Sequence, residues 1–198
     1  MLLALILAAS PSPLLSDPQI AAALGRIEAT PGAWVEYAVR TRGKDEARVR
    51  ATVLEAQDPG RFWIELATVA ASGVPSAARL LVRGTSVALP DVERIYVMIA
   101  GQQPVEVPGD GAVAGGKSLP SVKVLGTERV RVPAGIFAAR ALRVSATLAW
   151  RSGEVPLWGL LKASSPRQSV ELTAFGWSGG RSVFPPGWDQ GKGSESAK

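Results

Sequence analysis

The chain has 198 residues, a formal net charge of +5, and neither cysteine nor histidine. The absence of cysteine excludes disulfides and thiolate nucleophiles, and the absence of histidine removes the usual general base near neutral pH and the commonest metal ligand. With 46% apolar and 20% charged residues, the composition is typical of a folded protein, and the length fits one domain.

The chain begins with an unbroken apolar run, Met1 to Ala9. A membrane span needs about twenty residues, so this run is too short to cross a bilayer. Small residues and prolines follow it, as in a secretory signal peptide, although the first basic residue is Arg26 and the usual positive n-region is missing. We therefore expect an atypical signal peptide over residues 1–16 and a periplasmic or extracellular location. A short buried apolar segment is the alternative.

A short helix is predicted after this segment. Asp17-Pro18 is a helix-start signal, because Asp caps free N–H groups and Pro fits the first helical turn. The apolar residues Ile20, Leu24 and Ile27 recur at helical intervals, and the helix is expected to end near Thr30-Pro31-Gly32.

From Trp34 onward the hydrophobic period changes to two residues. Alternating runs cover residues 34–40, 47–53 and 62–66, and turn residues separate them at 43–45 and 58–60. This pattern is typical of an antiparallel meander with one apolar and one charged face.

The registers of this meander can be predicted from the alternation. Pairing Val39 with Val49, and Val53 with Ile64, keeps every apolar residue on one face, and a slip of one residue would break that agreement. The opposite face then carries a charged set and one tryptophan: Glu36, Arg40, Arg48, Arg50, Trp63 and Glu65.

Weaker strand patterns continue to residue 175. They lie at residues 78–83, 94–99, 121–125, 128–132, 137–144, 146–151 and 169–175. We predict a mainly β (α+β) domain over residues 17–184, built as a large curved antiparallel sheet or incomplete β-barrel with a short N-terminal helix and a short covering segment. A Gly- and Pro-rich stretch at 102–120 is expected to be a flexible excursion, and residues 185–198 a disordered tail.

The catalytic inventory is thin. Ser-His-Asp and Cys-His arrangements are impossible, no glycine-rich phosphate or dinucleotide loop follows a strand, and the in-strand acids Glu36, Glu65 and Glu171 alternate with apolar residues as solvated positions do. We expect no enzyme activity, no cofactor and no metal site. A hydrolase that uses only Asp or Glu is the enzymatic alternative.

Two residue types suggest binding instead. Arg40, Arg48 and Arg50 share one ribbon face with Arg42, which favours either attraction to an anionic surface or an ordinary solvated sheet face. Nucleic acid is not expected, because no aromatic ladder interleaves these arginines. Six tryptophans could line a concave sheet and hold an apolar ligand, or could simply pack the core and sheet ends.

Several local patterns are shared with a known group of proteins. They are Gly32-Ala33-Trp34-Val35-Glu36-Tyr37, Phe62-Trp63-Ile64-Glu65-Leu66, Gly126-Thr127-Glu128-Arg129-Val130, Val132-Pro133-Ala134-Gly135-Ile136-Phe137, Glu154-Val155-Pro156-Leu157-Trp158-Gly159-Leu160-Leu161-Lys162 and Glu171-Leu172-Thr173-Ala174-Phe175-Gly176. Over roughly residues 32–180 the chain resembles a family of uncharacterised secreted bacterial proteins. The resemblance implies a fold similar to the periplasmic lipoprotein carriers (LolA-like), an incomplete antiparallel barrel whose concave apolar face is covered by short helices. It implies no catalytic residues.

Two binding functions follow from these patterns. The first is a non-enzymatic exported protein that binds a lipid or lipidated polypeptide on the concave face, through Val35, Tyr37, Val39, Ile64, Leu66, Leu157, Trp158 and Leu161. The second is an envelope interaction module that uses a sheet edge or the basic face, with Arg40, Arg48 and Arg50 meeting a protein partner or, peripherally, a membrane surface.

Overall fold

The computed structural model describes residues 27–56, 59–84, 91–99, 102–107 and 121–188. The expected signal peptide over residues 1–16 and most of the predicted helix lie outside these residues. The last predicted helical residues, 27–30, are not helical, because Glu28 forms an isolated antiparallel bridge with Leu157. No helix in the described part of the chain is long and apolar enough to cross a membrane.

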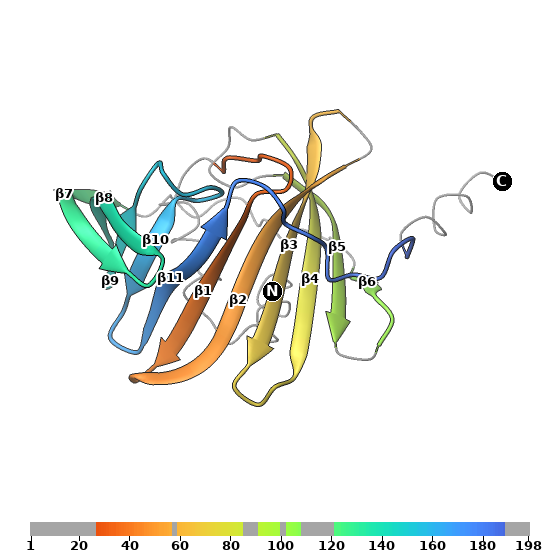
Figure 1. Ribbon diagram of the computed structural model, residues 1–198, viewed down its shortest axis with the longest axis horizontal. Helices are drawn as coiled ribbons and strands as arrows, with labels where there is room; N and C mark the ends of the chain where they lie inside the picture. Colours follow the sequence, from red (N-terminus) through yellow and green to blue (C-terminus); the bar gives the residue numbers. More distant parts are fainter. Residues whose placement is uncertain (1–26, 57–58, 85–90, 100–101, 108–120, 189–198) are drawn as a thin grey trace.

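In the described ranges, eleven antiparallel strands form a single sheet, which confirms the prediction of a mainly β fold (Figure 1). Their order across the sheet is β6-β5-β4-β3-β2-β1-β11-β10-β9-β8-β7, so two meanders meet where β1 pairs with β11. The strands are β1 (Trp34–Thr41), β2 (Lys44–Glu55), β3 (Arg61–Ala70), β4 (Pro75–Arg83), β5 (Asp91–Ile99), β6 (Val105–Val107), β7 (Val122–Val132), β8 (Gly135–Val144), β9 (Thr147–Arg151), β10 (Leu160–Ser164) and β11 (Gln168–Gly176).

Two strands lie where the sequence did not predict them. β6 falls within the stretch 102–120, where we expected a flexible excursion, and it pairs with β5; residues 108–120 lie outside the described part of the chain. β10 begins within the segment around residues 157–161 that we expected to cover the concave face, and it pairs with β9 and β11.

The predicted register is confirmed for one hairpin and wrong for the other. Val53 faces Ile64 across β2 and β3, as predicted. Across β1 and β2, however, Val49 faces Tyr37 rather than Val39. The difference of two residues keeps the same faces and has two causes: the turn lies at Arg42-Gly43, both with positive φ, and β1 is irregular after Val39.

One face of the sheet, which we call the inner face, carries the hydrophobic core. Val35, Tyr37 and Val39 are fully buried there and belong to one continuous cluster that also includes Ile64 and Leu161. Alternation along the strands therefore places the apolar residues together, as the period of two predicts.

The meander from β7 to β11 curls back on itself. The N–H of Ala134, in the turn between β7 and β8, donates to the carbonyl of Leu172 in β11 over 3.2 Å. β7 also contacts β10 and β11. This half of the molecule is the strongly curled one at the left of Figure 1, and the β1–β6 half spreads as an open fan.

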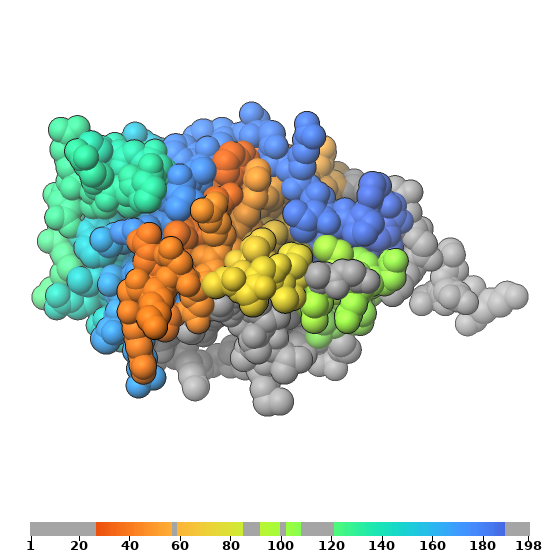
Figure 2. Space-filling view, turned by 60° about the horizontal axis from the view of Figure 1, so that its bottom comes forward, coloured from red at the N-terminus to blue at the C-terminus, as the bar shows by residue number. Residues whose placement is uncertain are grey.

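The opposite, outer face of the fan is crossed by the last described residues, 177–188, which we call the C-terminal strap (blue in Figures 1 and 2). The strap begins beside β1, where the N–H of Gly180 donates to the carbonyl of Gly32 over 2.8 Å. A Cβ on Gly180 would lie 2.8 Å from that same carbonyl oxygen, so this close approach requires glycine.

The strap is fastened in its middle by Glu65. We expected this residue on a solvated face, but its side chain is only 1% exposed. The Ser182 hydroxyl donates to one carboxylate oxygen over 2.6 Å, and the Val183 N–H donates to the other over 2.7 Å. Glu65 is therefore on the predicted face, and the strap removes it from solvent.

The end of the strap packs on aromatic residues of the outer face. Phe184 and Trp188 form a second hydrophobic cluster with Trp63 and Tyr96, and the Trp188 ring lies 4.4 Å from that of Tyr96. The tail that we expected to be disordered from residue 185 is thus packed on the sheet as far as Trp188; the residues beyond it lie outside the described part of the chain.

Removal of the Glu65 carboxylate should release the strap. Glu65→Ala leaves the Ser182 hydroxyl and the Val183 N–H without their acceptor and should lower the free energy of unfolding by roughly 1–3 kcal/mol, and Glu65→Gln, which keeps one acceptor, by less. Glu55→Ala, at the exposed end of β2, is the matched control and should cost under about 0.5 kcal/mol. Urea denaturation followed by tryptophan fluorescence measures both. Equal costs for the two alanine variants would contradict the role given to Glu65.

Candidate functional site

The segment between β9 and β10, residues 152–159, is a compact loop closed by its own hydrogen bonds. The Ser152 N–H donates to the Gly159 carbonyl over 2.8 Å, and the Gly159 N–H donates to the Pro156 carbonyl over 3.1 Å. We call this loop the covering segment, since it contains Leu157 and Trp158 of the segment that was predicted to cover the sheet around residues 157–161. Its side chains Val155 and Leu157 are buried in the main core.

Two backbone positions fix the shape of the covering segment. Gly159 has φ +65°, and a Cβ there would lie 2.5 Å from the Ser152 carbonyl oxygen. Leu157 has φ 59°, a left-handed conformation that costs a non-glycine residue about 1–2 kcal/mol. Burial of its side chain and a hydrogen bond from the Glu28 N–H to its carbonyl, 2.9 Å long, hold it there. Arg42 and Ser145 have similar φ values, but they lie in the turns of hairpins, whereas Leu157 lies inside a buried loop.

A partly open pocket of about 700 Å³ lies beside this segment. Its volume is within the range of about 300–1,000 Å³ that is usual for small-molecule sites. Three buried apolar side chains, Ile27, Val155 and Leu157, contribute to it from the core. The other described lining residues are Glu28, Ala29, Thr30, Arg140, Arg151, Ser152, Gly153 and Gly159.

Two arginines face each other in this pocket. Arg140 of β8 lies directly opposite Arg151 of β9. Arg151 is partly buried, and its Nε donates to the Trp158 carbonyl over 2.9 Å, which aims the guanidinium. Burial, and then the neighbouring positive charge of Arg140, lower the pKa of Arg151 below its ordinary value. Positive charge is therefore concentrated at this pocket, where Arg151 is partly shielded from solvent and Arg140 is exposed.

The eight side chains predicted to bind a ligand have different places in the structure. Leu157 lines the pocket, and the carbonyl of Trp158 orients Arg151. The remaining six belong to the inner face: Val35, Tyr37, Val39, Ile64 and Leu161 are buried, and Leu66 is partly buried against the same core.

Tyr37 connects this core to β10, the strand that follows the covering segment. Its hydroxyl is fully buried and donates to the carbonyl of Leu160, the first residue of β10, over 3.1 Å. Burial raises the pKa of the Tyr37 hydroxyl far above its ordinary value, because the phenolate would have to form without water.

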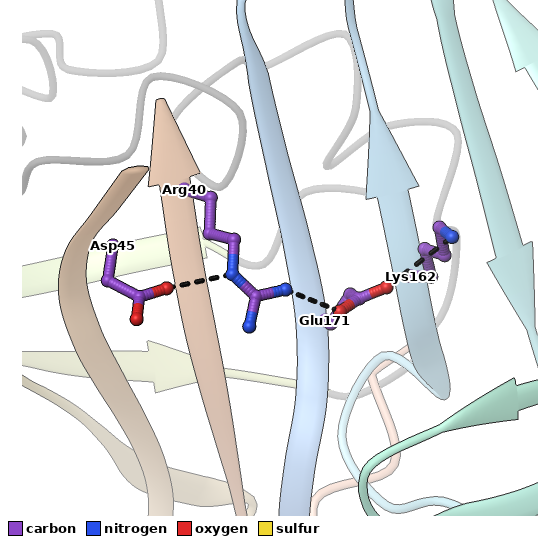
Figure 3. Close-up of polar contacts among 4 residues, drawn as sticks. All are labelled: Arg40, Asp45, Lys162 and Glu171. Carbon is purple, nitrogen blue, oxygen red and sulfur yellow. Dashed lines mark hydrogen bonds and ion pairs between the residues drawn. The ribbon is translucent and has the colours of Figure 1, made fainter. Parts of the chain in front are cut away.

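The predicted basic face is mostly occupied by other side chains. Arg40 lies between two carboxylates: its Nε is 2.8 Å from Asp45 Oδ1, and its Nη1 is 2.9 Å from Glu171 Oε2 (Figure 3). The other oxygen of Glu171, Oε1, lies 3.4 Å from Lys162 Nζ. These pairs raise the pKa of Arg40, chiefly through its hydrogen bond to Asp45.

The other two predicted surface arginines differ from each other. The Arg50 guanidinium carbon lies 4.1 Å from the centre of the Trp34 ring, a cation–π contact, whereas Arg48 is exposed. Of the three arginines, only Arg48 has neither an ion pair nor an aromatic contact with the described residues.

Sequence reasoning missed both pocket arginines. Arg140 and Arg151 lie in strands that were predicted, but their pairing depends on the β8–β9 register, which the sequence-based interpretation did not assign. The alternation of Arg140 with apolar neighbours was available as a signal. Within the described ranges, no cluster of acidic residues could hold a metal ion.

The chain was compared with protein families, curated sequences and solved structures. No model of a known protein family matches the chain, and no curated protein sequence matches it significantly. The structure is similar to a predicted exported protein with a YmcC-like fold from Bacteroides fragilis NCTC 9343, at 11% identity and a TM-score of 0.42, over 77% of this chain and 99% of that chain. It is also similar to a predicted lipoprotein from Parabacteroides distasonis ATCC 8503, at 12% identity and a TM-score of 0.38, over the same shares of the two chains. At these values neither similarity assigns a family, an activity or a location, and the resemblance to the lipoprotein carriers stays a prediction from the sequence.

Replacement of Gly159 should disrupt the covering segment. Gly159→Ala forces a Cβ against the Ser152 carbonyl in a left-handed conformation, so the variant should unfold at lower denaturant, with a loss of about 2 kcal/mol or more. Gly153→Ala, in the same segment but with open space around its Cβ, should change stability by under about 0.5 kcal/mol. Chemical denaturation of the two variants side by side checks this. A loss at Gly153 as large as that at Gly159 would show that the close contact is not the cause.

The buried Tyr37 hydroxyl predicts a dependence of stability on alkaline pH. The unfolded state releases this proton near the ordinary pKa of 10.0 and the folded state keeps it, so the free energy of unfolding falls as pH rises above about 10. Tyr37→Phe should cost about 1 kcal/mol at neutral pH, because the Leu160 carbonyl loses its donor, and should reduce the alkaline slope by up to about 1.4 kcal/mol per pH unit. Denaturation at a series of pH values measures both effects. An unchanged slope in the variant would contradict the assignment to Tyr37.

Proposed function

We propose that this protein is an exported, non-enzymatic binding protein that holds a small lipid-like ligand in the pocket beside the covering segment. The observation that carries the proposal is the pocket itself, which brings core side chains into an open space of about 700 Å³. An apolar group that enters it would lie against Ile27, Val155 and Leu157, at the edge of the hydrophobic core.

This proposal differs in location from the sequence-based hypothesis, which put the ligand on the inner sheet face itself. The residues named for that face are packed against one another in the core. A ligand that replaced them would have to displace buried apolar contacts, whereas a ligand in the pocket adds new ones. Export is supported by the signal-like apolar run at the start of the chain.

The alternative of an interaction module with a basic face is less well supported. Arg40 is already paired with two carboxylates, and Arg50 lies on the Trp34 ring. A partner would have to compete with these contacts, which leaves Arg48 as the available cation of the three.

A neutral apolar dye tests the proposed pocket without involving charge. Nile red should bind the wild-type protein with increased fluorescence, and Ala29→Trp, which introduces an indole among the lining residues, should weaken binding by about tenfold. Ala138→Trp, at an exposed position of β8 outside the pocket, is the control and should bind as the wild type does. Equal binding by both variants, or no binding by the wild type, would contradict the proposal. Native mass spectrometry of the purified protein gives an independent test through co-purified lipid.

A further inference from the structure

In two places an arginine lies directly opposite another arginine on the neighbouring strand, and the two pairs differ in whether a carboxylate lies between them. Arg61 of β3 faces Arg83 of β4, and Arg140 of β8 faces Arg151 of β9. Like charges in this position destabilise a sheet. One carboxylate, that of Glu93 in β5, forms ion pairs with both arginines of the first pair. Its Oε2 lies 2.8 Å from Arg61 Nε, and its Oε1 lies 2.5 Å from Arg83 Nη2. The structure thus contains its own example of how such a pair is compensated.

No carboxylate compensates the second pair among the described residues. The Arg151 Nε is bound to the Trp158 carbonyl, and no other hydrogen bond of this guanidinium joins it to the described part of the chain. Glu28 is the one acidic residue among the described lining residues, and neither arginine forms an ion pair with it. Glu93 lies between the arginines of the first pair, whereas the arginines of the second pair line the pocket.

The pocket distinguishes this pair from other like-charged neighbours. Lys123 and Arg143 also face each other, across β7 and β8, but both are exposed, so solvent screens their repulsion. In the pocket pair Arg140 is exposed too, but Arg151 is partly buried, and burial, followed by the positive charge of Arg140, lowers the pKa of Arg151. A charge pair that costs stability and is left uncompensated in a cavity is typical of a binding site.

We infer that Arg140 and Arg151 recognise the anionic oxygen group, a carboxylate or phosphate, of an amphiphilic ligand whose apolar part rests on Ile27, Val155 and Leu157. This inference rests on the proposed function and adds the chemistry of the ligand's polar end. A planar guanidinium fixed at Nε presents its terminal amino groups to two oxygens at once, and a second guanidinium opposite it completes the neutralisation. The bound anion takes the place that Glu93 has in the other pair.

Three probes separate the two ends of the ligand. Decanoate has both the anion and the chain, decanol has only the chain, and acetate has only the anion. Titration calorimetry of the full chain should show decanoate binding at least tenfold more tightly than decanol or acetate, with an affinity that falls as salt rises. Decanol that binds as tightly as decanoate would overturn the inference and leave the proposed function standing. Acetate that binds as tightly as decanoate would support the arginine pair but overturn the lipid-like ligand. No binding of any probe would overturn both.

A charge-matched pair of variants assigns the effect to the pocket. Arg140→Gln should lower decanoate affinity about tenfold and leave that of decanol unchanged. Arg143→Gln removes the same charge from the same strand outside the pocket and should change neither. Equal losses of decanoate affinity in the two variants would overturn the inference.

A stability measurement gives a readout that does not need a ligand. Because Arg140→Gln relieves an uncompensated repulsion, the ligand-free variant should melt at the same temperature as the wild type or higher. Arg61→Gln, which leaves Glu93 with one partner fewer, should melt lower. A lower melting temperature for Arg140→Gln would show that Arg140 has a stabilising role and would overturn the inference.

Discussion

The pairing of β1 with β11 is the interaction on which the rest of this structure depends. It joins two meanders that would otherwise be separate sheets, and it runs the length of β1, from Trp34 opposite Gly176 to Thr41 opposite Gln168. Through it the Tyr37 hydroxyl comes within reach of Leu160, which fixes the start of β10. The covering segment ends at that point, so the geometry of the pocket is set by a contact between strands more than 120 residues apart in the chain.

The same pairing determines what happens on the outer face. β11 ends beside the start of β1, so the strap that follows it begins there and crosses the outer face from β1 towards β5. The strap then covers Glu65 and Trp63, two residues whose strand positions alone indicate exposure to solvent. The sheet is therefore buried on both faces along part of its length, by the core on one side and by its own C-terminal segment on the other.

Local patterns in the sequence predicted the elements and their faces, and the long-range contacts escaped prediction. Alternation was sufficient to place Val53 opposite Ile64 and to assign Trp63 to the outer face. It could not place the β1–β2 turn, since Arg42-Gly43 lacks the Asn or Asp that usually indicates a two-residue turn. The burial of Glu65 depends on Ser182 and Val183, and the arginine pair depends on the β8–β9 register. Of the candidate site, only Leu157 was predicted from the residues themselves.

The position of β1 in the sheet affects the order in which the chain folds during synthesis. Among the described residues β1 is the first strand and β11 the last, yet they are neighbours at the centre of the sheet. Contacts of such long sequence separation form late and slowly, because the entropy cost of closing a large loop comes before the contacts stabilise the fold. During synthesis the edge of β1 that pairs with β11 therefore stays unpaired until β11 has been made. Glu65 likewise lacks its hydrogen-bond donors until Ser182 and Val183 have been made. A chain cut short before β11 would lose the central pairing, the strap and the anchored covering segment together, so the fold separates complete chains from incomplete ones.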